Sequence, residues 1–161
     1  MTMISVDIGG GESHEYASGI TAGEVIQNVH GKKSGAVAAT VDGEERDMSD
    51  ILDSDCKVEP IIGDSEQGLY IVRHSCAHLL AQAVTELFPD AKPTIGPPIE
   101  HGFYYDFHMD PIGEGEMHEI EKRMKELVKQ NIPMEREEHG NDSLREMFAS
   151  NPFKLEIMDE K

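Results

Sequence analysis

The sequence contains no tryptophan and only two cysteines, Cys56 and Cys76. Two cysteines cannot build the disulfide framework of a small secreted domain, so a reducing cytoplasm is the expected compartment. No apolar stretch approaches the roughly 18 residues that a membrane-spanning helix needs. The first residues, MTMISVDIGG, lack the basic segment and apolar core of a secretory signal. These absences predict a cytoplasmic protein without a membrane partner.

Basic residues are also scarce, with 14 lysines and arginines against 32 aspartates and glutamates, for a net charge of −18. Such a charge repels polyanions at long range, which argues against a nucleic-acid partner. A salt-rich cytoplasm offers another explanation, because screening there shortens electrostatic interactions to a few Å. The composition leaves both explanations open.

Residues 1–62 predict a small β domain with one helix. Thr21 and Glu24 form a capping-box pattern before an amphipathic segment, and Gly31 follows as a stop signal. The flanking segments alternate like short strands: MISVDI, HEYAS, AVAATV, EERDM and CKVEPII. A β-β-α-β-β order predicts a ubiquitin-like β-grasp. The polar stretch GDSEQG, residues 63–68, predicts a linker.

Residues 69–161 predict a second domain with longer helices. Its expected elements are a helix over residues 70–88, a strand within 102–107, a helix over 114–130, a short helix capped by Asp142 or Ser143, and a final strand at 153–158. The fold class is therefore α+β, with a long helix against a mixed or antiparallel sheet. The sequence stops directly after the expected strand, so this domain is expected to be incomplete.

The first of these helices carries His74 and His78 four positions apart. At about 100° per residue the two rings are neighbours on one face, whereas Cys76 falls on the opposite side. Cys76 is therefore expected to be a small buried side chain rather than a ligand. The histidines could be structural rings, half of a zinc site, or a general base with a positioning group. Helical periodicity does not separate these three interpretations.

The segment RHSCAHLLAQAVTELFPDAKPTIGPPIEHGFYYDF resembles the start of the editing domain of threonyl-tRNA synthetases. That family has an H-x-x-x-H helix followed by I-G-P-x-I-x-x-G-F-Y-Y-D, matched here from His74 to His78 and from Ile95 to Asp106. Residues 1–62 match the family's TGS domain in order. The family's downstream C-x-x-x-H motif and class II core do not occur in this sequence, so the resemblance implies an N-terminal fragment. ATP, magnesium and zinc are then expected only in the missing core, and no cofactor or metal is expected here.

The resemblance also implies a reaction, the hydrolysis of a seryl ester mistakenly attached to the 3′ end of tRNA(Thr). His74 and His78 would be the catalytic residues, while Tyr105 and Lys154 would bind substrate. A core aromatic and a solvated edge-strand charge are the structural alternatives for the last two. The expected partners are the tRNA(Thr) acceptor end and the rest of the synthetase chain, which favours the salt-adapted explanation of the acidic charge. The basic cluster of Lys122, Arg123, Lys125 and Lys129 could track phosphates or pair with nearby glutamates. The alternative function is a non-catalytic TGS-type binding or regulatory module.

Overall fold

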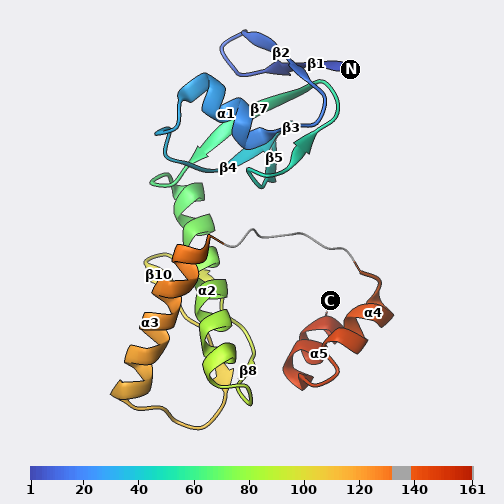
Figure 1. The fold of residues 1–161 in the computed structure, drawn as a ribbon. Helices are drawn as coiled ribbons and strands as arrows, with labels where there is room; N and C mark the ends of the chain where they lie inside the picture. The colour runs from blue at the N-terminus through green and yellow to red at the C-terminus, as the bar shows by residue number, and fades with distance from the viewer. Residues whose placement is uncertain (132–138, 161) are drawn as a thin grey trace. The chain divides into compact units, whose positions relative to one another are not determined.

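The computed structural model describes residues 1–131 and 139–160. The chain divides into two compact units, Met1–Val72 and Arg73–Lys161. The described residues form five helices together with a mixed five-stranded sheet and three short two-stranded ladders (Figure 1). The predicted α+β class is therefore confirmed. No helix in the described part of the chain has both the length and the apolar character needed to cross a membrane.

The sheet of the first unit has the order β2-β1-β7-β4-β5. Strands β1 and β7 run parallel at its centre, and the remaining neighbours are antiparallel. A second antiparallel ladder joins β3 to β6. The strand bounds are β1 Met3–Asp7, β2 Ser13–Ala17, β3 Ile20–Thr21, β4 Ala36–Val41, β5 Glu44–Arg46, β6 Ile51–Leu52 and β7 Cys56–Ile62.

Helix α1 (Ala22–His30) covers one face of this sheet (Figure 1). Its predicted capping box is confirmed: the Glu24 amide donates to Thr21 Oγ1 at 3.2 Å, and the Thr21 amide donates to Glu24 Oε2 at 2.9 Å. These bonds satisfy two amides that lack partners within the helix. Val25 and Ile26 then reach the core, where each is 1% exposed. They pack with apolar residues of the strands, including Ile4, Val6, Ala39 and Val58.

Helix α2 (Glu66–Leu87) begins at Glu66, so residues 66–68 of the predicted linker are helical. The reason is a side-chain cap that the sequence interpretation overlooked. Ser65 Oγ accepts a hydrogen bond from the Gly68 amide at 3.0 Å, which starts the first turn. The helix ends at Leu87, one residue before the predicted end at residue 88.

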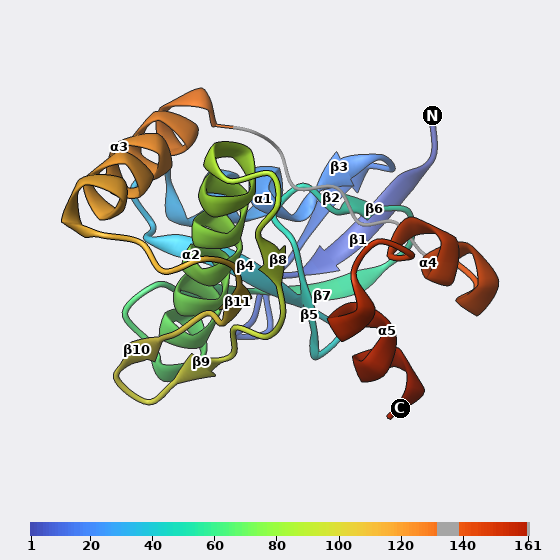
Figure 2. The same cartoon turned by 90° about the horizontal axis from the view of Figure 1, so that it is seen from below.

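The second unit has short strands and one long helix packed on α2. Strand β8 (Lys92–Pro93) pairs with β11 (Phe107–His108), and β9 (Pro98–Ile99) pairs with β10 (Gly102–Phe103), all antiparallel (Figure 2). Helix α3 (Glu114–Gln130) has the predicted bounds. It buries two apolar side chains against α2 and the segment that follows, in a core formed by Ala83, Val84, Ala91, Ile120 and Leu127.

The strand predicted within residues 102–107 is divided into β10 and β11. The segment opposite contains Pro97 and Pro98, which have no amide hydrogen to donate to a continuous ladder. The break leaves residues 104–106 outside the strands.

The final strand predicted at residues 153–158 is wrong, because these residues lie in helix α5 (Pro152–Asp159). Asn151 caps this helix by accepting from the amides of Phe153 and Lys154, and Pro152 occupies the first turn, where proline is tolerated. The preceding helix α4 (Asn141–Met147) follows Gly140, so neither Asp142 nor Ser143 is its N-cap.

Candidate functional site

His74 and His78 lie one turn apart on α2, and their Nε2 atoms are 2.9 Å apart. The ring centroids are separated by 4.6 Å with an interplanar angle of 71°. At this distance one nitrogen donates a hydrogen and the other accepts it. The predicted proximity of the two rings is therefore confirmed. Both residues are exposed, so neither ring is sealed in apolar packing.

The pKa of His78 is lowered from the ordinary histidine value. The main cause is loss of solvent around the ring, and the nearby His74 and the positive charge of Lys154 lower it further. A lowered pKa keeps the imidazole neutral near pH 7. A neutral imidazole has one nitrogen lone pair that can accept a proton.

Lys154 and Tyr105 are also brought together. The Lys154 ammonium donates to the Tyr105 hydroxyl at 3.5 Å and lies 6.0 Å from the centre of its ring. Lys154 comes from α5 and is partly buried, so it is not the solvated strand charge considered from the sequence. The structure thus brings these residues together in two pairs, His74 with His78 and Lys154 with Tyr105, and the charge of Lys154 contributes to the lowered pKa of His78.

Gly96 holds the Tyr105 ring in place, a role that sequence reasoning missed. A Cβ atom at Gly96 would lie only 2.1 Å from Tyr105 Cδ2, so the ring rests directly on the glycine backbone. The segment that contains Gly96 is joined to the segment that contains Tyr105 by hydrogen bonds from the amide and hydroxyl of Thr94 to the Asp106 carbonyl, at 2.9 and 2.8 Å. Tyr105 also stacks on Phe107 with a centroid distance of 4.8 Å. The I-G-P motif was the available signal for this contact.

Arg73, directly before the first histidine, is a second residue that the sequence interpretation missed. Its Nη1 donates to the carbonyl oxygens of Glu100 at 2.5 Å and Ile99 at 3.4 Å. These bonds attach α2 to the turn between β9 and β10. They therefore fix the histidine helix against the loop that carries the I-G-P motif.

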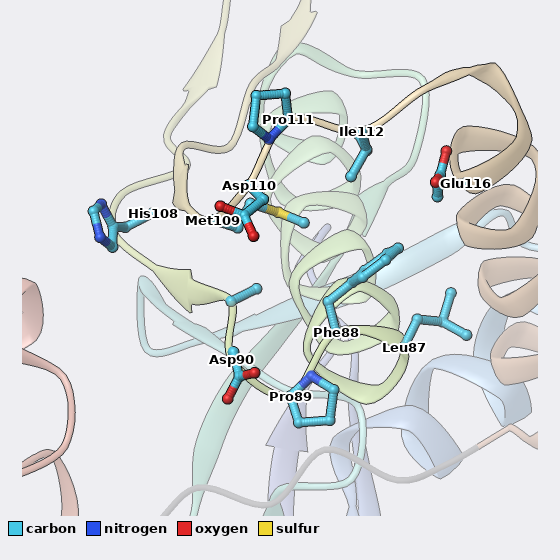
Figure 3. A pocket seen from close by; sticks show the side chains of 11 residues that line it. Leu87, Phe88, Pro89, Asp90, His108, Met109, Asp110, Pro111, Ile112 and Glu116 are labelled. Atoms are coloured by element: carbon cyan, nitrogen blue, oxygen red, sulfur yellow. The ribbon is translucent and has the colours of Figure 1, made fainter.

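A cavity of about 440 Å³ opens beside His78. It lies between α2 and α3 and is lined by Ser75, His78, Leu79, Gln82, Leu127, Val128 and Asn131. A second cavity, of about 500 Å³, lies at the C-terminal end of α2 (Figure 3). Its lining includes Phe88, Asp90, Asp110 and Glu116 but none of the four site residues. Open space next to the predicted pair is thus found at His78.

The remaining candidates do not join this group. Cys76 is a half-buried free thiol. Within residues 1–131 and 139–160, no three His, Cys, Asp or Glu side chains are placed to hold a metal ion. In the basic cluster, Arg123 pairs with Glu86 and Glu126, and Lys125 pairs with Glu121. These two cations are therefore engaged with glutamates, as the pairing interpretation predicted.

Comparison with known proteins gives relatives of one kind. No protein-family model matches the chain. The chain is 51% identical over 114 residues to a threonine–tRNA ligase of Thermoplasma volcanium, which covers 71% of this chain and 17% of that protein. It is 45% identical over 152 residues to the enzyme of Thermobifida fusca, covering 94% and 23%. For the Rubrobacter xylanophilus enzyme the identity is 37% over 160 residues, covering 98% and 25%.

These relatives place the chain among the aminoacyl-tRNA synthetases. The chain spans between about a sixth and a quarter of the length of the relatives it matches. The aligned region covers most of this chain in each case. The chain belongs to the threonine–tRNA ligase family.

Proposed function

We propose that this chain is the N-terminal part of a threonine–tRNA ligase and carries part of the editing site that, in the whole enzyme, hydrolyses a seryl ester on the 3′ end of tRNA(Thr). The observation that carries the proposal is the exposed pair of imidazoles of His74 and His78, supported by the Lys154–Tyr105 pair, whose positive charge acts on His78. An accessible proton acceptor and a nearby cation are what ester hydrolysis requires.

A separate hydrolytic site has a physical reason in this family. Threonine and serine differ by one methyl group, and a binding pocket gains only about 1–3 kcal/mol from such a difference, or roughly 10–200-fold. Aminoacyl-tRNA synthetases for small side chains exemplify the remedy, a second site that admits and hydrolyses the smaller product. Serine enters such a site, whereas the extra methyl group of threonine is excluded.

In the proposed step, neutral His78 accepts a proton from water as the water oxygen bonds to the ester carbonyl carbon. The Lys154 ammonium stabilises the negative charge that develops on the carbonyl oxygen. The bond between that carbon and the ribose oxygen then breaks, and the proton passes from the histidine pair to the departing ribose. His74 orients His78 through their shared hydrogen bond, while Tyr105 fixes Lys154 and contacts the ester or terminal adenosine. The step needs only water as co-reactant, so no cofactor is assigned to this chain.

We assign the first unit to the TGS type of β-grasp domain. The support is the order β2-β1-β7-β4-β5, with a central parallel pair and one helix packed on the sheet. The joining of threonine to tRNA(Thr) with ATP is proposed for the whole synthetase. Its ATP, magnesium and zinc are assigned to parts of the enzyme outside this sequence.

The test is hydrolysis of seryl-tRNA(Thr) and of threonyl-tRNA(Thr) by the whole synthetase that contains this chain and by its His78→Ala and His74→Ala variants. We expect faster hydrolysis of the seryl ester and a loss of about 10²- to 10⁴-fold in the His78 variant, the usual contribution of a positioned general base. His101→Ala is the matched control, because that side chain is 87% exposed and outside the site.

Equal hydrolysis of both esters, or full activity of His78→Ala, contradicts the proposal. Retained tRNA binding without hydrolysis of the seryl ester by the unmodified synthetase would instead favour the non-catalytic binding module. Binding is measured on the same preparations, so the two outcomes are separated directly.

A further inference from the structure

Asn151 uses both ends of its side-chain amide to join two distant segments. Its Oδ1 accepts from the amides of Phe153 at 3.2 Å and Lys154 at 3.3 Å, at the start of α5. Its Nδ2 donates to the carbonyl of Pro93 at 2.9 Å, in strand β8. The residue is half-buried. One side chain therefore caps the helix and attaches it to a strand.

The strand that Asn151 contacts lies beside the segment that carries Tyr105. Pro93 pairs with Phe107 across the β8–β11 ladder, and Phe107 stacks on the Tyr105 ring. Asn151 is thus bonded to the same local scaffold that holds Tyr105. The cap by Asn151 also fixes the backbone amide of Lys154. One side chain therefore holds both the helix that carries Lys154 and the scaffold beside Tyr105, the two partners of the Lys154–Tyr105 hydrogen bond.

A second contact supports the same docking of α5. The Phe153 ring lies 5.3 Å, centre to centre, from the ring of His108 in β11. A contact between two rings is less directional than a hydrogen bond, so it holds the helix near the strand without setting its rotation. The directional bonds of Asn151 set that rotation, because hydrogen bonds weaken steeply with misalignment.

We propose that Asn151 is a positioning residue that places the Lys154 ammonium against Tyr105. The inference rests on the proposed editing function for its catalytic consequence, but the placement itself is independent of that function. An amide is required because the position needs both an acceptor for the helix cap and a donor for Pro93. Serine supplies the acceptor for a cap but is too short to bridge to the strand.

The test compares Asn151→Ser with Asn141→Ser. Both substitutions leave the charge of the chain unchanged, and Asn141 lies at the start of the neighbouring helix α4. Lys154→Gln serves as the reference for complete loss of the charge. The readout is the pKa of His78, measured by NMR titration of the ring in the full 161-residue chain.

Because the Lys154 charge lowers the pKa of His78, its displacement raises that pKa. We expect Asn151→Ser to raise it in the same direction as Lys154→Gln, while Asn141→Ser leaves it unchanged. We also expect hydrolysis of seryl-tRNA(Thr) to fall about 10- to 100-fold in kcat, the scale of an ångström-sized misplacement. An unaltered His78 pKa in either Asn151→Ser or Lys154→Gln overturns the proposal.

The two proposals fail separately. If the whole synthetase does not hydrolyse seryl-tRNA(Thr), the editing function fails, and the His78 titration still decides the placement. If circular dichroism shows that Asn151→Ser has lost helix α5, the placement is tested instead by NMR of the Asn151 side chain in the unmodified chain. Protected Asn151 amide hydrogens with a nuclear Overhauser contact to Pro93 support the proposal, and freely exchanging ones without that contact overturn it.

Discussion

Replacing Gly96 by alanine should displace the Tyr105 ring and destabilise the second unit. The added Cβ would lie 2.1 Å from Tyr105 Cδ2 and 2.6 Å from Cε2 and Cγ. Carbon atoms in contact normally stay about 3.5–4.0 Å apart, so the ring or the loop must move by roughly 1.4 Å. The ring cannot move freely, because Phe107 stacks on it and Lys154 bonds its hydroxyl. Overpacking of this kind costs about 1–3 kcal/mol.

The assay is urea unfolding followed by NMR signals of the second unit, combined with the chemical shifts of Tyr105. Gly102→Ala is the matched control, since a Cβ atom there meets nothing within 4 Å. We expect Gly96→Ala to lower the free energy of unfolding and to shift the Tyr105 signals, with little effect of Gly102→Ala. If both variants unfold like the unmodified chain and the Tyr105 signals stay in place, the reasoning about this contact is refuted.

Two further predictions concern the histidine pair and the first unit. Because His78 has a lowered pKa when folded, the unfolded chain binds more protons, and the free energy of unfolding should decrease as pH falls through the unfolded value of about 6.5. His78→Gln should flatten this dependence in urea titrations at several pH values; an identical slope in His78→Gln and His101→Gln would rule the effect out. Thr21→Ala removes the side-chain acceptor of the α1 cap and should cost about 1 kcal/mol of stability in the first unit. Thr2 lies outside the helices and strands, so Thr2→Ala is the control. Equal melting temperatures of the two variants would contradict the prediction.

Several elements followed from the sequence because their signals are local. The capping box at Thr21 and Glu24 needs only residues three apart, and it forms as predicted. Helix α3 was placed with the observed bounds from its 3-4 apolar spacing. The His74–His78 contact followed in the same way, since one helical turn separates the two rings.

The sequence led to a wrong prediction for the last element of the chain. Residues 153–158 read FKLEIM, which alternates like a strand, yet they form α5. The cap that starts this helix is Asn151, whose second bond goes to Pro93, 58 residues earlier. A short segment of this kind has weak intrinsic preference, so the cap by Asn151 and its bond to the distant strand together decide its conformation.

By itself, the sequence determined the helical face that carries both imidazoles and the motif order that relates the chain to its family. The tertiary structure alone decided that Lys154 meets Tyr105, 49 residues away, and that Gly96 seats the Tyr105 ring. The physical reason is range. Helical periodicity and capping act over a few residues, whereas the position of a side chain from another element depends on how the intervening strands and loops pack.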